Sequence, residues 1–161
     1  MTKAEYLSWF DEVVQPTESL FRRVPSDKLG FQLTPRSFTI GQQLRHIPAS
    51  FAYMAKVVNK EELPFKSVRE ILVANRRHPS ATVDEAIEGL KQATDVFKQA
   101  MGRLTDDQFQ NGIIDTPQKG NIPYWRYGAF ALEHHIHHLM ELHICLRILS
   151  VDVNTKTLYE G

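Results

Sequence analysis

The sequence predicts an all-α protein, a four-helix bundle with a long loop between the first two helices and a short extra helix before the third. Apolar residues recur at helical spacing in four long segments. β alternation is weak, with a few residues near 111–115 as the exception. Three of four expected helix starts carry a capping box, in which a threonine and the Glu or Gln three positions later satisfy free backbone amides. These pairs are Thr2 with Glu5, Thr39 with Gln42, and Thr82 with Glu85.

The first long helix is expected from about Lys3 to Arg23. Pro16 should kink it or split it in two, because proline has no amide hydrogen to donate. A loop rich in turn residues then leads to the second helix, from about Ile40 to Asn59. We expect a bend near His46, at the border of the buried stripe, since Pro48 lies inside this helix. The predicted stripe consists of Ile47, Phe51, Met54 and Val58.

Three further segments complete the predicted bundle. A short helix is expected around Ser67–Asn75, and the third long helix from about Val83 to Leu104. Residues 116–121 predict a turn or a tight hairpin. Pro123 suits the first turn of the fourth helix, which should continue to about Leu149.

Composition narrows the class of protein. The chain has 161 residues with 19 basic and 19 acidic side chains, so its formal charge is zero when the seven histidines are neutral. Balanced charge offers no basic patch for phosphates, which argues against nucleic-acid partners. The chain has one cysteine, an N-terminus without the apolar stretch of a signal peptide, and no membrane-length apolar segment. We expect a single cytoplasmic domain over residues 1–161 with no membrane partner.

Histidines are concentrated in the fourth predicted helix, where five of the seven fall between His134 and His143. Residues four apart lie one turn apart on one helical face, so His134 and His138 should project together toward the core. His135 is expected at the edge of that face. His137, at the opposite edge, and His143, on the back, are weaker candidates for a site.

This histidine pair predicts a metal site if a third ligand joins it, because two nitrogens rarely hold an ion tightly. His46 is the other histidine in a long predicted helix, and it borders the buried face. Three histidine ligands leave positions for water or substrate, which is typical of a reactive metal. Glu141 projects on the same side as His134 and is a candidate catalytic residue: a general base, a fourth ligand or an acceptor for a ligand imidazole. The alternative is that these are hydrogen-bonded core histidines that bind no metal.

Two stretches resemble the DinB-like (DNA-damage-inducible) superfamily. Residues 38–46, Phe-Thr-Ile-Gly-Gln-Gln-Leu-Arg-His, resemble the start of that family's second helix, which ends in its first metal histidine. Residues 134–149, His-His-Ile-His-His-Leu-Met-Glu-Leu-His-Ile-Cys-Leu-Arg-Ile-Leu, resemble its terminal helix. The resemblance in helix order and loop length spans nearly the whole chain. It implies a DinB-like four-helix bundle in which His46, His134 and His138 bind a divalent metal such as zinc or nickel.

The sequence departs from the family at Leu139-Met140-Glu141, where Arg-Gly-Gln is usual. Met140 stands in the place of the glycine, so the close helix packing that glycine allows is not expected there. Glu141 puts a carboxylate in the place of the amide, which could change the metal preference or the reactivity of the site. Some family members resemble S-transferases that use a low-molecular-weight thiol. The resemblance therefore implies a metal-dependent transferase or hydrolase with a small-molecule substrate. A non-catalytic, dimeric module that binds a small ligand or acts in a stress response is the alternative.

The fourth helix is predicted to be apolar on nearly every side. Another part of the chain or a second copy must cover its back face, and we expect a homodimer through it. Cys145 lies on the core face and is expected to be a packing residue rather than a nucleophile. The residues predicted to project from the back face are Trp125, Leu132, Ile136, Leu139 and Met140.

Overall fold

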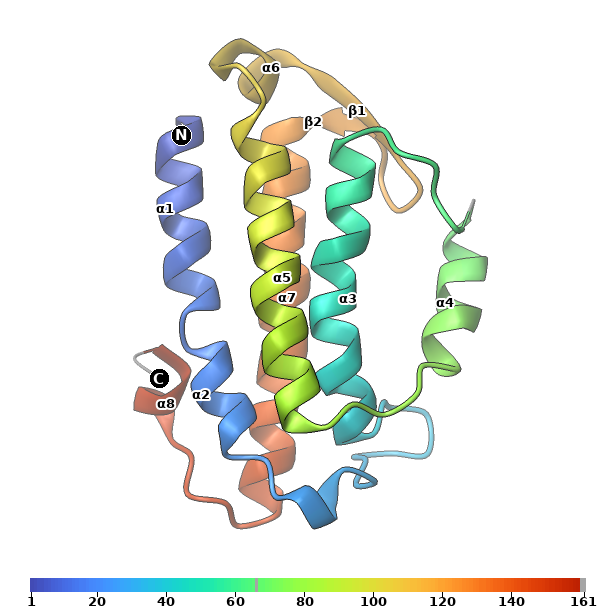
Figure 1. Ribbon diagram of the computed structural model, residues 1–161, viewed down its shortest axis with the longest axis vertical. Helices are drawn as coiled ribbons and strands as arrows, with labels where there is room; N and C mark the ends of the chain where they lie inside the picture. Colours follow the sequence, from blue (N-terminus) through green and yellow to red (C-terminus); the bar gives the residue numbers. More distant parts are fainter. Residues whose placement is uncertain (66, 160–161) are drawn as a thin grey trace.

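The computed structural model describes residues 1–65 and 67–159 and is mostly helical (Figure 1). Long helices lie side by side along the long axis: α1 (Lys3–Val14), α3 (Ile40–Val58), α5 (Val83–Gly102) and α7 (Tyr124–Ile148). α3 packs against α5 and α7, and α1 packs against α7 and α5. Shorter elements connect or cover them: α2 (Thr17–Arg22), the 3-10 helix η1 (Ser26–Lys28), α4 (Val68–Arg76), α6 (Asp106–Asn111) and α8 (Thr155–Tyr159).

Helix starts follow the local sequence closely. Each of the three predicted capping boxes is formed, with the hydroxyls of Thr2, Thr39 and Thr82 accepting from the amide three residues later. A fourth capping box, Thr105 with Gln108, begins α6, a helix that the apolar pattern did not predict. Capping therefore marks helix starts even where a helix is too short to show a periodic stripe.

The prolines have three different effects. Pro16 separates α1 from α2, so the predicted first helix is split in two. Pro48 does not end its helix, because α3 continues through it from Ile40 to Val58. Pro123 was predicted in the first turn of α7 but is its N-cap residue, because it still pairs with Ile113 in the preceding hairpin.

A two-stranded antiparallel hairpin precedes α7. β1 (Ile113–Thr116) pairs with β2 (Gly120–Pro123), and Thr116 faces Gly120 across the turn. Gly120 has a positive φ of 64°, which glycine adopts without strain. The prediction of a turn or hairpin over residues 116–121 is confirmed.

The core lies between the long helices and is rich in aromatic rings. The Phe10 ring centroid lies 5.2 Å from that of Phe51 and 5.4 Å from that of Phe97. The Tyr6 hydroxyl donates to the Gly128 carbonyl at 3.0 Å, and a Cβ on Gly128 would lie 2.7 Å from the Tyr6 ring. α1 and α7 therefore meet at a contact that needs glycine. The predicted stripe of α3 is buried, namely Ile47, Phe51, Met54 and Val58.

The prediction for the back of α7 is wrong at three residues. Leu132 and Leu139 are buried, because α1 packs against α7 on that side. His143 is also buried, since the segment after α7 folds back and brings the Asn154 carbonyl 3.3 Å from its Nε2. The other predicted residues of this face, Trp125, Ile136 and Met140, are exposed.

Within residues 1–65 and 67–159, helices long and apolar enough to cross a membrane are absent.

Candidate metal centre

Two helices bring three of the predicted histidines together. His46 lies on α3, and His134 and His138 lie one turn apart on α7. Packing of α3 against α7 places the Nε2 atoms of His46 and His134 3.2 Å apart, although the residues are 88 positions apart in the sequence. One ring nitrogen from each of the three histidines lies within 4.8 Å of the other two. The structure thus contains the triad of imidazoles that the sequence predicted.

The rings are enclosed by protein. His46 is buried, and His134 and His138 are half-buried. The His138 ring centroid lies 4.5 Å from that of His46 and 4.6 Å from that of His134. Phe38 packs its ring against His46 at 4.9 Å between centroids. This packing limits the rotamers of the imidazoles and keeps their nitrogens close together.

Burial keeps the three imidazoles neutral. It lowers the pKa of His46 far below the usual 6.5, and the neighbouring His138 and His134 lower it further. The pKa of His134 falls to about 4, again mainly through burial. The pKa of His138 falls to about 3 through burial and then its histidine neighbours. A neutral imidazole carries the lone pair that binds a metal ion, so the donors are ready at physiological pH.

The geometry fits a single divalent ion. Two nitrogens bound to one zinc ion at ~2.0–2.1 Å can be at most about 4.2 Å apart. The 3.2 Å separation of the His46 and His134 nitrogens meets that limit, and all three nitrogens lie within 4.8 Å of one another, which is close to it. Three neutral nitrogens favour ions such as zinc or nickel over magnesium or calcium, which prefer oxygen. The triad could therefore hold a divalent metal.

Ser50 is a site residue that the sequence interpretation missed. It lies one turn after His46 on α3, and its hydroxyl donates to the His46 carbonyl at 2.8 Å. The same oxygen lies 3.3 Å from His46 Nε2 and 3.2 Å from His134 Nε2. Its four-residue offset from His46 was the available signal, since that spacing puts both side chains on one helical face.

His78 was also missed, because it lies between the short helix expected around Ser67–Asn75 and the long one expected from Val83. Its ring centroid lies 6.0 Å from that of His46, and its Nε2 lies 3.2 Å from Asn75 Oδ1. Burial lowers the pKa of His78, and the nearby Arg45 lowers it further. Nothing local predicted this placement, since it depends on the path of the chain between α4 and α5.

Glu141 lies beside His138 rather than within the triad. Its Oε2 is 3.6 Å from His138 Nδ1, which is beyond ordinary hydrogen-bond distance. Burial raises the pKa of this carboxyl group. Within the described residues, His138 Nδ1 has no hydrogen-bond partner. Among the described residues, the Glu141 carboxylate is thus the acidic group that lies beside His138 Nδ1.

The remaining histidines of this helix and its cysteine lie outside the triad. His135 is buried, with its Nε2 2.9 Å from the Thr17 hydroxyl oxygen. His137 is exposed. Cys145 is fully buried, and burial raises the pKa of its thiol. A buried thiol with a raised pKa is a poor nucleophile.

Two histidines of the triad are reachable from a cavity. His46, Ser50 and His134 line one end of a space of about 390 Å³ between α3 and α4. This volume falls within the range of small-molecule sites. A molecule of that size could contact the imidazole nitrogens.

Residues 10–142 match the model of the DinB superfamily. The fold is similar to that of a DinB-like protein from Bacillus cereus, with a TM-score of 0.74, 16% identity, and coverage of 95% of this chain and 96% of that one. A DinB-like protein from Bacillus subtilis has a TM-score of 0.67 and 19% identity, and the match covers 92% of this chain and 94% of that one. A DinB family member from Shewanella denitrificans has a TM-score of 0.57 and 12% identity, and the match covers 99% of this chain and 90% of that one. Among curated proteins, no match to the sequence was found.

Proposed function

The chain belongs to the DinB superfamily, and from this membership and its histidine triad we propose that it is a divalent-metal-binding protein with His46, His134 and His138 as ligands. We infer that α1, α3, α5 and α7 constitute the four-helix bundle of this family. The long loop then lies between α2 and α3, and α4 is the short extra helix.

The proposed activity is that of a metal-dependent transferase, similar to a thiol S-transferase, or of a hydrolase. A bound divalent ion supplies Lewis acidity, which lowers the pKa of a water or a thiol toward neutrality. The observation that carries the proposal is the convergence of three neutral imidazoles, of which those of His46 and His134 line a cavity. The cavity would bring a small substrate, such as a low-molecular-weight thiol, to these nitrogens.

Glu141 would act as a positioning residue. A carboxylate beside His138 Nδ1 favours a proton on that nitrogen and leaves Nε2 with its lone pair for the ion. The 3.6 Å separation would have to shorten for a hydrogen bond to form. Of the three roles considered for Glu141, acceptor for a ligand imidazole is the one that its contact with His138 supports.

Metal content tests the proposal. Protein prepared without a histidine tag should carry close to one divalent ion per chain by elemental analysis, with zinc and nickel as the expected metals. His138→Ala should lose the ion, because two nitrogens rarely hold it tightly. His137→Ala is the matched control, since His137 is exposed on the same helix, and it should keep the full content.

Full metal content in His138→Ala would contradict the ligand assignment. Protein that takes up no zinc or nickel, and whose thermal stability does not rise when either is added, would favour the non-catalytic ligand-binding alternative, because an ion that binds only the folded state must stabilise it.

We also propose a homodimer through the outer face of α7. Ile136 and Met140 on this face are exposed, as are Ile144 and Ile148 further along the helix. Burying them against a second copy would remove apolar surface from water. Light scattering at micromolar concentration should then give twice the chain mass of 18.5 kDa. A value near the chain mass would contradict this proposal.

A further inference from the structure

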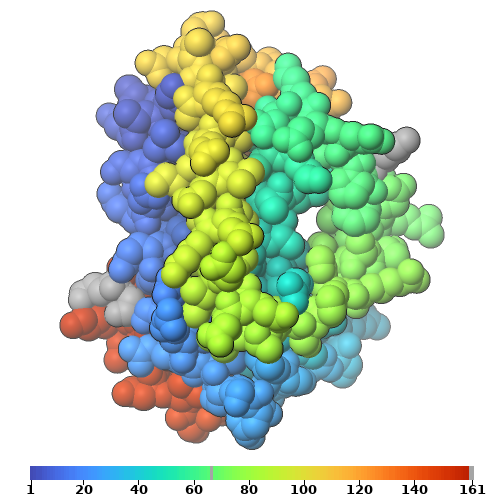
Figure 2. All heavy atoms as spheres, in the orientation of Figure 1, coloured from blue at the N-terminus to red at the C-terminus, as the bar shows by residue number. Residues whose placement is uncertain are grey.

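The cavity beside the triad is lined by both polar and apolar residues. The polar ones include His46, Ser50 and His134, together with Lys56, Asn75, His78 and Gln118. The space between α3 and α4 is visible as an opening in Figure 2, where the two helices stand apart. Apolar or small residues from both helices line its walls: Ala49, Ala52 and Tyr53 on α3, and Val68, Ile71 and Leu72 on α4.

α4 turns its apolar stripe toward this cavity. Val68, Ile71 and Leu72 share one helical face with Asn75 and line the cavity with it. Val68 is nevertheless 42% exposed and Leu72 56% exposed, and α4, which lies wholly in the described range, has no buried residue. An apolar group placed between the two helices would bury these side chains. Such burial stabilises a complex in proportion to the apolar area removed from water.

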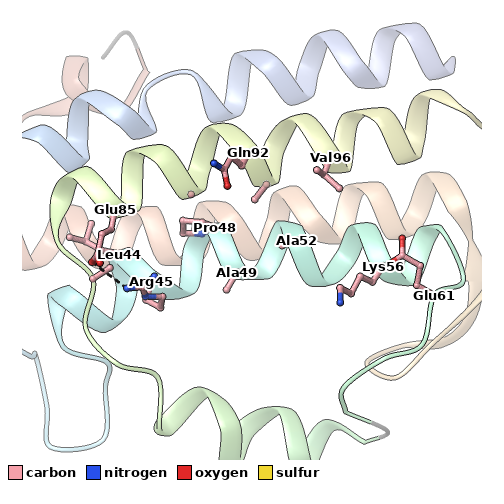
Figure 3. Close-up of a pocket in the computed structure, with 14 residues that line it drawn as sticks. Leu44, Arg45, Pro48, Ala49, Ala52, Lys56, Glu61, Glu85, Gln92 and Val96 are labelled. Atoms are coloured by element: carbon pink, nitrogen blue, oxygen red, sulfur yellow. Dashed lines mark hydrogen bonds and ion pairs between the residues drawn. The ribbon is translucent and has the colours of Figure 1, made fainter.

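The opposing face of α3 leaves room for such a group. Ala49 and Ala52 line the cavity and also a second space of about 420 Å³ between α3 and α5 (Figure 3). Ala52 lies six residues after His46, which is about 9 Å along a helix. The space beside α3 therefore extends from His46 along the helix, and two alanine methyl groups leave room there between the larger side chains of Tyr53 and Lys56.

We propose that the molecule handled at the histidine triad is amphiphilic: it carries a metal-binding polar head and an apolar chain or ring that lies between α3 and α4. This inference rests on the proposed function for the position of the head. The apolar part is assigned by the cavity walls, which belong to different residues from the metal ligands. The substrate class is thus a small molecule with an apolar body rather than a fully polar metabolite.

A series of n-alkyl thiols tests this assignment. Cobalt(II) replaces the native ion, and the absorption band of a thiolate bound to cobalt reports each thiol at the triad. Affinity should rise about 4-fold for each added methylene between ethanethiol and hexanethiol, hence about 250-fold over the four methylenes. An affinity that does not change with chain length would overturn the inference. Cobalt uptake together with binding of ethanethiol would at the same time support the proposed function.

Two matched variants locate the apolar site. Ala52→Trp should remove the dependence on chain length, because Ala52 is exposed on the cavity wall and a large side chain there fills the space. Ala4→Trp, an exposed position on α1 remote from the cavity, should leave the dependence unchanged. Cobalt content should be the same in both variants and the wild type. The same dependence of thiol affinity on chain length in Ala52→Trp and Ala4→Trp would overturn the inference.

A second measurement does not depend on the metal. The fluorescence of 8-anilinonaphthalene-1-sulfonate should rise more with metal-free wild type and Ala4→Trp than with Ala52→Trp. Failure of cobalt uptake would refute the proposed function, whereas equal dye binding by all three proteins would refute the apolar site.

Discussion

α3 and α4 are both amphipathic helices, yet their apolar residues lie in different environments. α3 buries Leu44 and Phe51 against the other long helices, whereas no residue of α4 is buried within its fully described range. Apolar spacing predicts that a segment is helical and which face is apolar. Whether that face is buried depends on another element lying against it. In this protein the difference gives the candidate site a packed side that holds His46 and an open side that can receive a ligand.

The largest expected effect is a difference in unfolding free energy between two variants, one with an apolar side chain truncated on α3 and one with an apolar side chain truncated on α4. Phe51→Ala should lower the free energy of unfolding by about 3–5 kcal/mol, because Phe51 is 2% exposed and packs against three aromatic rings. Leu72→Ala should change it by no more than about 0.5 kcal/mol, because Leu72 is 56% exposed. Urea denaturation measures both. Similar losses in the two variants would mean that α4 is packed as firmly as α3.

An intermediate effect is expected on metal affinity, and it should differ between a residue beside His138 on α7 and a residue on α4. Glu141→Gln should weaken metal binding about 10- to 100-fold, because the amide is a weaker acceptor for His138 Nδ1 than the carboxylate. Asn75→Ala, on α4, should leave metal affinity unchanged, since its partner His78 is outside the triad. Competition with a chromophoric chelator measures both affinities. Unchanged affinity in Glu141→Gln would remove the positioning role of this residue.

The smallest effect concerns the helix caps. Thr39→Ala should cost about 1 kcal/mol of unfolding free energy, because its hydroxyl caps the start of α3. Ser67→Ala removes the cap of α4 and should change global stability by no more than about 0.5 kcal/mol, since a helix without buried residues can open locally. Urea denaturation gives the global values, and hydrogen exchange should show faster exchange confined to α4. Equal global losses would show that α4 unfolds together with the core.

Much of the fold was predictable because its signals are local. The capping boxes at Thr2, Thr39 and Thr82 and the break at Pro16 depend on residues within one turn, and the structure has all four. The helices α6 and α8 were not predicted, because they are too short to show an apolar period. The burial of His143 was not predictable either, since it depends on a contact with Asn154 in the segment that folds back.

The sequence by itself determined that His134 and His138 share one face of α7, because a four-residue offset has the same consequence in any α-helix. It also marked His46 as the candidate third ligand. Only the tertiary structure decided that the nitrogens of His46 and His134 meet at 3.2 Å, that the Ser50 hydroxyl lies within 3.3 Å of both, that the His78 ring lies beside His46, and that α4 stands apart from α3. The physical reason is the sequence separation of the residues in contact. A helix forms through contacts within a few residues, whereas helix packing depends on many weak contacts between segments that are distant in the sequence.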